Sequence, residues 1–312
     1  MKIINTFDDY IGNEDVKAML REAIASAKSR NEPLDHVFIS GFSGAGKSTL
    51  AKVIANEMGV EFEEILCSGK NIGKLNIKLM KMKDFSILLM DEIHNLVTDQ
   101  AEGLYKFFDQ GQVQFNFPGK APILLDAKKI TLIGATTEIS KIATPFYNRF
   151  PIQIRLENYT SDELDTIVIN NVISENLNLT HDAITVISRA SKGVPRDSQN
   201  LIRRVRDHIK MHYSNYNEIS EQIVIDALAL NGIDEHGLNT IDRAYITTLF
   251  EVFNGEKTGV ESIALQLQVE KEVLIRTVEP HLLRAGYIFK SSNGRALDEK
   301  GFQLAMEYSA NK

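Results

Sequence analysis

The sequence predicts an α/β domain with a parallel sheet, then an all-α domain, then a winged-helix domain at the C-terminus. Between residues 36 and 156, short apolar runs alternate with helical segments, which is typical of a parallel sheet covered by helices. From Asn158 onward the hydrophobic spacing is helical. Near the C-terminus, Asn293-Gly294 lies between two extended runs, a strong signal for a β-hairpin that follows three helices.

The composition is that of an ordinary globular protein without a broadly basic surface. The chain has 312 residues, enough for about two domains or three small ones, and is 43% hydrophobic and 25% charged. Its net charge of −7 restricts any contact with nucleic acid to a local basic patch. Cys67 is the single cysteine, so no disulfide can form within the chain. Because no signal peptide or membrane-length apolar run is visible, we expect a cytoplasmic protein.

The first domain is expected to contain an N-terminal helix, five strands and an inserted hairpin. Apolar residues recur at helical spacing over residues 13–30. Buried strands are expected at 37–39, 62–66, 87–90, 130–134 and 152–156. Alternation on both sides of Pro118-Gly119 predicts a β-hairpin over about 112–126, between the third and fourth strands. A protruding hairpin is a candidate contact for a partner protein.

Helices alone are expected after the sheet domain, until the terminal wing. Thr160 and Glu163 form a capping box that opens a helix ending near residue 176. The other helices are expected at 181–190, 195–213, 220–230, 239–253, 258–267 and 270–286. Extended runs at 287–290 and 295–297 then complete a winged helix-turn-helix.

The first domain is organised around a phosphate-binding loop. Residues 41–49, Gly-Phe-Ser-Gly-Ala-Gly-Lys-Ser-Thr, fit G-x-x-x-x-G-K-[ST] between an apolar run and a helical segment, the context that the motif requires. Glycines let the backbone N–H groups turn toward phosphate oxygens at the positive end of the following helix. Lys47 can reach the outer phosphates, and the Ser48 hydroxyl is a suitable oxygen ligand for Mg²⁺. A chance match in a Gly/Ser-rich turn is the plainer alternative, which this context disfavours.

An apolar strand that ends in two acids predicts the second part of a nucleotide site. The run 87–90 delivers Asp91 and Glu92 to the carboxyl edge of the sheet, where α/β proteins bind their ligands. Asp91 would complete the Mg²⁺ shell, and Glu92 would polarise the attacking water. Seen alone, an Asp-Glu pair is often the solvated start of a loop. Its occurrence together with the phosphate loop favours the functional interpretation.

Three further residues carry weaker signals when read without a family. Thr136 ends another apolar strand and could reach the γ-phosphate or its water, although a Thr-Thr pair is as often a helix cap. Arg149 and Arg196 are isolated arginines that could stabilise a transition-state phosphate, although a surface ion pair is the commoner role.

Other polar groups suggest no site. The basic residues at helical spacing are most simply a solvated helix face: Arg203, Arg204, Arg206 and Lys210. His94, His208 and His212 show no metal-ligand spacing, so no metal site beyond Mg²⁺ is predicted.

With these motifs in order, the chain resembles the AAA+ ATPases and, among them, the RuvB-type motors that drive Holliday-junction branch migration. The resemblance spans nearly the whole chain. It rests on strings at matching separations: 7–12, 33–37, 55–59, 91–94, 132–137, 201–207 and Gly294-Arg295. It implies an AAA+ ATPase large domain over 1–157, a helical lid domain over 158–234 and a winged-helix DNA-binding domain over 235–312.

The resemblance implies roles for single residues. Thr136 would be sensor 1, Arg196 would be sensor 2, and Arg149 would be the arginine finger that completes a neighbouring subunit's site. The residues that would bind ATP are Tyr10, Ile11, Gly44, Gly46, Lys47, Ser48, Thr49, Tyr159 and Arg196. The catalytic set would be Lys47, Asp91, Glu92, Thr136, Arg149 and Arg196, with Ser48 and Asp91 as Mg²⁺ ligands. The residues that would contact DNA are Lys271, Lys290 and Arg295.

The same resemblance implies an assembly and an activity. It implies a homohexameric ring around duplex DNA, and a RuvA-like junction-binding partner that contacts the 112–126 hairpin. The expected function is an ATP-driven motor that migrates Holliday junctions by translocating duplex DNA. Two alternatives stay open: a clamp-loader-like or other AAA+ DNA-remodelling ATPase, and a non-hydrolysing ATP switch that scaffolds DNA complexes.

Several positions depart from the family pattern. The phosphate loop reads Gly-Phe-Ser-Gly-Ala-Gly in place of Gly-Pro-Pro-Gly-Leu-Gly, and Ser48 replaces threonine. Residues 2–5 lack the usual Arg-Pro-Lys, and 146–148 replace Leu-Arg-Asp ahead of Arg149. The stretches 68–91 and 112–126 are shorter than in typical members. These departures suggest a divergent paralogue, for example from a phage or mobile element, and put binding of a standard RuvA in question.

Overall fold

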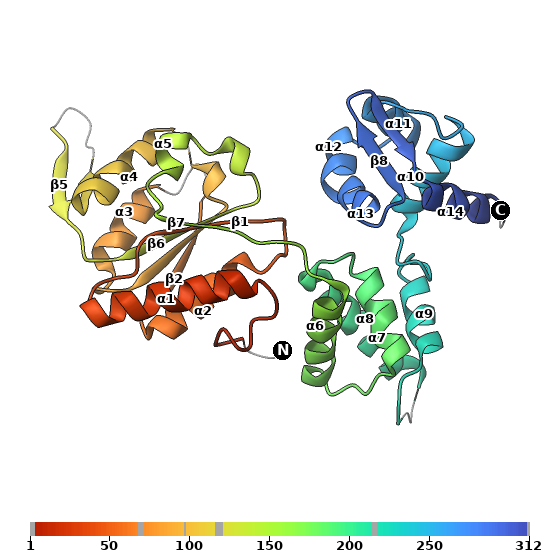
Figure 1. Cartoon of the computed structure of the whole chain (residues 1–312), viewed down its shortest axis with the longest axis horizontal. Coiled ribbons are helices and arrows are strands. Elements are labelled where there is room, and N and C mark those ends of the chain that lie inside the picture. The colour runs from red at the N-terminus through yellow and green to blue at the C-terminus, as the bar shows by residue number, and fades with distance from the viewer. Residues whose placement is uncertain (1–3, 68–71, 97, 116–120, 214–216, 311–312) are drawn as a thin grey trace. The chain divides into compact units, whose positions relative to one another are not determined.

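The computed structural model describes residues 4–67, 72–96, 98–115, 121–213 and 217–310 (Figure 1). The chain divides into two compact units, residues 1–163 and 164–312, and each is described by itself. Among the described residues, no helix is long and apolar enough to cross a membrane.

The first unit is built on a parallel sheet of five strands, which confirms the predicted fold class. The strand order is β2-β3-β6-β1-β7, and every neighbouring pair is parallel. The strands are β1 (Val37–Ser40), β2 (Phe62–Leu66), β3 (Ile87–Asp91), β6 (Thr131–Thr136) and β7 (Ile152–Arg155). Each begins within one residue of a predicted apolar run, because a central parallel strand is buried on both faces and reads as a continuous apolar segment.

Helices cover both faces of this sheet (Figure 1). They are α1 (Glu14–Arg30), α2 (Lys47–Met58), α3 (Ile72–Lys81), α4 (Thr98–Gln110) and α5 (Thr144–Tyr147), with 3-10 turns at Ile93–Asn95 and Ile139–Lys141. Along β3, Ile87 and Leu89 pack into the core beneath α1 and α2, whereas Leu88 and Met90 pack into the core beneath α3 and α4. This two-residue alternation is what a pleated strand imposes.

The expected hairpin forms a separate antiparallel sheet. Strands β4 (Gln112–Phe115) and β5 (Ile123–Asp126) pair with Val113 opposite Leu125. The predicted turn at Pro118-Gly119 lies outside the described residues. Ile123, Leu124 and Leu125 of β5 are each more than 40% exposed. The hairpin therefore presents an apolar strand away from both cores.

Helices follow the sheet, as predicted. They are α6 (Ser161–Ser174), α7 (His181–Ala190), α8 (Pro195–His212) and α9 (Glu221–Ala229), and the boundary between the two units falls inside α6. The capping box is present: the Glu163 carboxylate accepts from the Thr160 backbone N–H at 2.8 Å, and the Thr160 hydroxyl accepts from the Glu163 N–H at 3.3 Å. Satisfying these otherwise unpaired N–H groups fixes where α6 begins.

The C-terminal part of the second unit is a winged helix. Its helices are α10 (Thr240–Glu251), α11 (Val260–Leu267), α12 (Lys271–Val273), α13 (Glu279–Arg284) and α14 (Glu299–Ala310), and its wing is β8 (Ile288–Ser291) paired with β9 (Gly294–Leu297). The helix predicted over 270–286 is interrupted by a π-helical turn at Leu274–Val278. Pro280 has no N–H to donate, so the regular α-helical bond pattern cannot run through this segment.

Helix α14, which follows the wing, was not predicted from the sequence. It packs into the winged-helix core through Leu304 and Ala305. Gly301 lets this helix approach the wing: a Cβ atom placed there would lie 1.9 Å from the backbone oxygen of Tyr287. The close approach of helix and backbone requires the smallest residue at this position.

We expect Gly301→Ala to destabilise the second unit. The added methyl group must displace the Tyr287 backbone, so α14 moves away from the wing, and the free energy of unfolding should fall by about 1–3 kcal/mol. Urea unfolding followed by circular dichroism measures the change. Gln303→Ala, at an exposed position of the same helix, is the matched control and should change the free energy of unfolding by no more than about 0.5 kcal/mol. Equal stability of the two variants would contradict the tight packing of α14.

Candidate nucleotide-binding site

The phosphate loop curls between β1 and α2 in the way its glycines predict. Gly44 and Gly46 both have left-handed backbone conformations, with φ of 78° and 95°. A Cβ atom on Gly46 would lie 3.0 Å from the Tyr10 hydroxyl and 3.2 Å from the Tyr159 hydroxyl. The loop thus needs glycine at this position for its conformation and for the space beside the two tyrosines.

Lys47, the first residue of α2, is buried inside the loop. Its ammonium donates hydrogen bonds to the carbonyl oxygens of Gly41 and Phe42, each at 3.0 Å. The 12-residue helix α2 begins without a side-chain cap, because its N-cap is Gly46. An ammonium and the uncapped N–H groups of a helix at one place form an anion site of the kind that binds phosphate.

The loop and β3 meet through Ser48 and Asp91. The Ser48 hydroxyl donates to the Asp91 carboxylate at 3.3 Å, and the other Asp91 oxygen accepts from the Glu92 backbone N–H at 2.9 Å. The sheet order brings them together, since β6 alone separates β1 from β3. A hydroxyl beside a carboxylate is a pair of hard oxygen ligands, which Mg²⁺ prefers.

Glu92 has a strained backbone conformation, and its side chain contacts neighbours that the sequence did not indicate. Its φ of 50° and ψ of 47° are left-handed, which is uncommon outside glycine and frequent at functional sites. One carboxylate oxygen accepts from the Thr137 hydroxyl at 3.3 Å and lies 3.3 Å from His94 Nδ1. The side chain therefore has a fixed direction beside the loop and beside Ser48 and Asp91.

Thr136 lies at the end of β6 and is fully buried. Its hydroxyl oxygen accepts from the Glu138 backbone N–H at 3.0 Å and lies 3.0 Å from His94 Nδ1. In the tautomer with the proton on Nδ1, His94 donates to this oxygen, and the Thr136 O–H remains to donate elsewhere. His94 thus links the predicted base, Glu92, to the predicted sensor.

Two tyrosines line the loop on its other side. The Tyr159 hydroxyl donates to the Ala45 carbonyl at 2.9 Å, while the buried Tyr10 hydroxyl has no hydrogen-bond partner among the described residues. Burial raises the pKa of both phenols, so both stay protonated. Ile11 lies next to Tyr10 and is half-buried. An unpaired buried hydroxyl and an apolar neighbour beside the loop fit a nucleotide.

Arg149 follows α5 and contacts α4. Its Nε and Nη2 donate to the two carboxylate oxygens of Asp109, both at 3.0 Å, and its Nη1 donates to the Pro145 carbonyl at 2.8 Å. The guanidinium also lies 4.0 Å from the ring centroid of Tyr105. These contacts were not predicted, because nothing in the spacing along the chain relates residues 105, 109 and 149.

In the second unit, Arg196 lies exposed in the first turn of α8. The predicted DNA contacts differ in exposure. Lys290 is about half exposed, 4.0 Å from Glu279, whereas the side chain of Arg295 is 11% exposed. The Arg295 guanidinium donates to both Glu279 oxygens, at 2.8 and 3.1 Å. The Arg295 guanidinium is thus paired with Glu279 inside the winged helix, and a contact of Arg295 with DNA stays a prediction.

Lys271, the third predicted DNA contact, is about half exposed and pairs with Glu261 at 3.4 Å.

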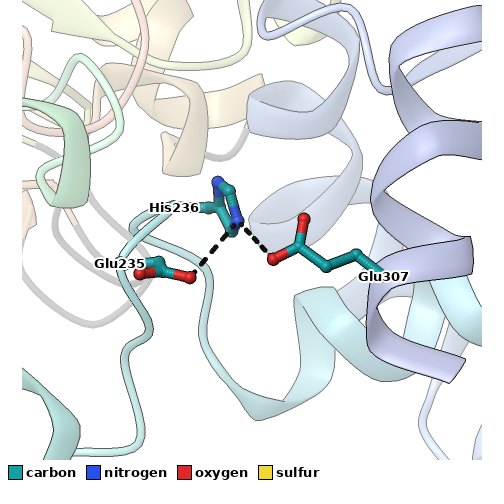
Figure 2. A group of neighbouring side chains, drawn as sticks. All are labelled: Glu235, His236 and Glu307. Carbon is teal, nitrogen blue, oxygen red and sulfur yellow. Dashed lines mark hydrogen bonds and ion pairs between the residues drawn. The ribbon is translucent and has the colours of Figure 1, made fainter. Parts of the chain in front are cut away.

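Another polar group, Glu235, His236 and Glu307, was not predicted (Figure 2). His236 Nε2 lies 3.4 Å from the Glu307 carboxylate and 3.9 Å from that of Glu235. Both acids meet one ring nitrogen at the surface, so this group is a polar contact that joins the segment before α10 to α14.

The first unit thus combines a parallel sheet, a phosphate loop and an acid pair at the carboxyl edge, which defines a P-loop nucleotide-binding protein. Residues 4–156 match the family described as "Holliday junction DNA helicase RuvB P-loop domain". Residues 159–234 match "RuvB AAA lid domain", and residues 235–305 match "RuvB C-terminal winged helix domain". The chain belongs to the RuvB family.

Relatives and solved structures agree with this assignment. The chain is 36% identical to a "Holliday junction branch migration complex subunit RuvB" of Kosmotoga olearia and 35% identical to that of Desulfosudis oleivorans, in each case over 95% of this chain and 87% of the relative. The structure of the Thermotoga maritima RuvB Holliday junction branch migration motor superposes with a TM-score of 0.82, at 31% identity, over 97% of both chains.

We expect Gly46→Ala to weaken nucleotide binding. The added methyl group meets both tyrosine hydroxyls, and the left-handed backbone costs about 1–3 kcal/mol for alanine, so the affinity for ADP should fall about tenfold or more. Isothermal titration with ADP measures this change. Gly59→Ala is the matched control, because its φ is also positive, at 75°, while nothing lies within 4 Å of the new methyl group. Gly59→Ala should lose stability and keep its affinity; a similar loss of affinity in both variants would contradict the role given to the tyrosines.

Proposed function

We propose that this protein is an ATP-driven motor that migrates Holliday junctions by translocating duplex DNA through a hexameric ring. The observation that carries the proposal is the meeting of Ser48, Asp91 and Glu92 at the phosphate loop, in a chain whose relatives are named as branch migration subunits. These names also favour branch migration over clamp loading. A non-hydrolysing switch would not need Glu92, whose side chain is held in place here by Thr137 and His94.

The nucleotide would be ATP with Mg²⁺. Gly44, Gly46 and Thr49 would offer backbone N–H groups to the phosphates, and Lys47 would exchange its loop carbonyls for phosphate oxygens. Ser48 and Asp91 would hold the ion, which neutralises charge on the triphosphate when bound. Tyr10, Ile11 and Tyr159 would line the adenine side.

Hydrolysis requires a general base and a residue that responds to the presence of the γ-phosphate. Glu92 would orient the attacking water and accept its proton, and His94 with Thr137 would keep the carboxylate from turning away. Thr136 would donate its O–H to the γ-phosphate or the water. Because His94 lies close to both side chains, loss of the γ-phosphate at Thr136 would also alter the position of Glu92.

The site would be completed between subunits. Arg149 lies at the surface of the first unit and would act on the nucleotide of a neighbouring copy, a contribution worth about 10³–10⁵ in rate for arginine fingers. A finger that acts in trans makes a closed ring, here a homohexamer, the natural assembly. Arg196 would serve as sensor 2 from the start of α8.

Movement of the lid would reach the DNA-binding domain through Lys192. This residue lies four positions before Arg196, and its ammonium pairs with the fully buried Asp242 near the start of α10. Its carbonyl oxygen accepts from Arg284 of α13 at 2.8 Å. An ion pair and a hydrogen bond of Lys192 thus connect the loop before Arg196 to the winged helix. Through them, the lid and the winged helix would move together.

The winged helix would grip the phosphate backbone with few cations. Lys290 and Lys271 are exposed, and Arg295 would hold the wing through Glu279 or reach DNA if that pair opens. With so few contacts, binding by one subunit would be weak and sensitive to salt, and the ring would add avidity. The apolar strand of the 112–126 hairpin would contact a RuvA-like partner. This work would take place in the cytoplasm.

The proposal is tested by measuring ATP turnover and junction migration by the purified chain. Four-way junction DNA should stimulate turnover, and a labelled junction should be converted to duplex products only with ATP and Mg²⁺. Linear duplex of the same length controls for non-specific stimulation. A folded protein whose turnover ignores DNA and which leaves junctions intact would overturn the proposal.

We expect Glu92→Gln to keep ATP binding and to stop turnover. The amide has the shape of the carboxylate and cannot accept the water's proton, so kcat should fall by about 10²–10⁴. Single-turnover hydrolysis and equilibrium binding of a fluorescent ATP analogue measure the two properties. Glu64→Gln, at an exposed position of β2, is the control and should hydrolyse ATP normally. Undiminished hydrolysis by Glu92→Gln would remove this residue from the mechanism.

We expect the double variant Lys192→Met, Asp242→Asn to separate hydrolysis from movement. It removes the ion pair without leaving a buried charge unpaired, so ATP turnover should persist while the length of junction migrated per ATP falls. Parallel measurement of phosphate release and junction conversion gives this ratio. Lys210→Met, at an exposed position of α8, should leave the ratio unchanged. An unaltered ratio in the double variant would show that movement is transmitted by another contact.

A further inference from the structure

Arg149 is anchored on both sides by aromatic packing. Phe150 is fully buried, and its ring lies 5.4 Å from that of Phe38 on β1 and 5.1 Å from that of Phe108 on α4. Phe146, three residues before Arg149, also packs on Phe108, with ring centroids 5.7 Å apart. The backbone that carries the finger and the helix that faces it are therefore parts of one packed cluster.

Helix α4 also holds the guanidinium of Arg149. Asp109, the residue after Phe108, accepts two hydrogen bonds of 3.0 Å from the Nε and Nη2 edge of Arg149. Arginine and carboxylate match in this paired geometry, which fixes direction as well as distance. Hydrogen bonding to Arg149 holds the pKa of the Asp109 carboxyl below its usual value, so Asp109 is ionised at neutral pH.

Tyr105, one helical turn before Asp109, fixes the plane of the Arg149 guanidinium. The Arg149 guanidinium carbon lies 4.0 Å from the centroid of the Tyr105 ring, a cation–π contact. Residues at i and i+4 of a helix share one face, so Tyr105 and Asp109 contact Arg149 together. With the Pro145 carbonyl, the side chain is constrained from three directions.

This arrangement leaves the finger able to bind a phosphate. Three of the five guanidinium N–H groups are used by Asp109 and Pro145 within the described part of the chain. One N–H on Nη1 and one on Nη2 remain. Asp109 therefore does not have to be displaced when an anion from another subunit approaches those two groups.

We propose that Asp109 and Tyr105 are positioning residues that hold the trans-acting Arg149 ready for the γ-phosphate of the neighbouring subunit. This inference rests on the proposed role of Arg149 as a finger. A free arginine side chain must be ordered at each catalytic cycle, at a cost in rotamer entropy. Because α4 orders it beforehand, this cost would not recur at each cycle, and the two remaining N–H groups would meet the transition state in a fixed direction.

The test compares ATP turnover by full-length Asp109→Asn, Tyr105→Leu and Arg149→Ala, each with four-way junction DNA. An asparagine can accept only one of the two bonds and places an N–H₂ group against a donor, so kcat should fall about 10- to 100-fold while KM for ATP changes little. Asp109→Glu should recover part of the loss. Glu22→Gln, an exposed carboxylate on α1, is the charge-matched control and should behave as the wild type.

Two readouts separate positioning from a general loss of structure. Asp109→Asn combined with Arg149→Ala should be no slower than Arg149→Ala alone, since both act through one group. Mixing Asp109→Asn with Lys47→Ala subunits should restore turnover, because the intact loop of one and the intact finger of the other then meet. Normal kcat for Asp109→Asn beside an inactive Arg149→Ala would overturn this inference and leave the proposed function standing. Normal turnover by Arg149→Ala would overturn the finger and this inference together.

Discussion

The contact between Ser48 and Asp91 depends on the register of three parallel strands. In β1, β6 and β3, Ser40 lies opposite Thr136 and Met90 lies opposite Gly134, so the loop, Thr136 and the two acids all emerge at one edge. Gly134 leaves room for the packing beside this edge, because a Cβ atom there would lie 2.8 Å from the Ile93 side chain and 3.2 Å from the Phe150 ring. A slip of one residue would shift Thr136 or Asp91 along the edge and would change the face of the sheet to which each side chain points.

The charged groups at this edge are hydrogen-bonded to partners within the protein before any nucleotide arrives. The Lys47 ammonium is held by two carbonyl oxygens, and the Asp91 and Glu92 carboxylates by a hydroxyl, backbone N–H and histidine. Lys47 and Asp91 would exchange these neutral partners for the phosphates and the metal ion of the proposed ligand. Pre-ordered groups of this kind favour binding and catalysis because little reorganisation is needed when the ligand enters.

The sequence predicted the elements whose signal is local. Strand ends, the capping box at Thr160 and the phosphate loop follow from short-range spacing, and their positions are close to those observed. The partners of the site residues were missed because they come from distant positions: Asp109 for Arg149, and Glu279 for Arg295. His94 had a usable signal, since it lies one short turn after Asp91 and Glu92. Helix α14 lacked one, because its apolar stripe is short and follows a hairpin that already completed the expected domain.

The pairing of Arg295 with Glu279 would shorten the time for which the wing retains duplex DNA. An acid with both oxygens on the wing's arginine cancels its charge where phosphates would pass. In the proposed motor, DNA would pass from one subunit to the next, and a duplex held by few net charges would be released at little cost. If the wing contacts DNA as proposed, the buried glutamate would suit it to brief attachment and rapid turnover of contacts, rather than to a permanent clamp.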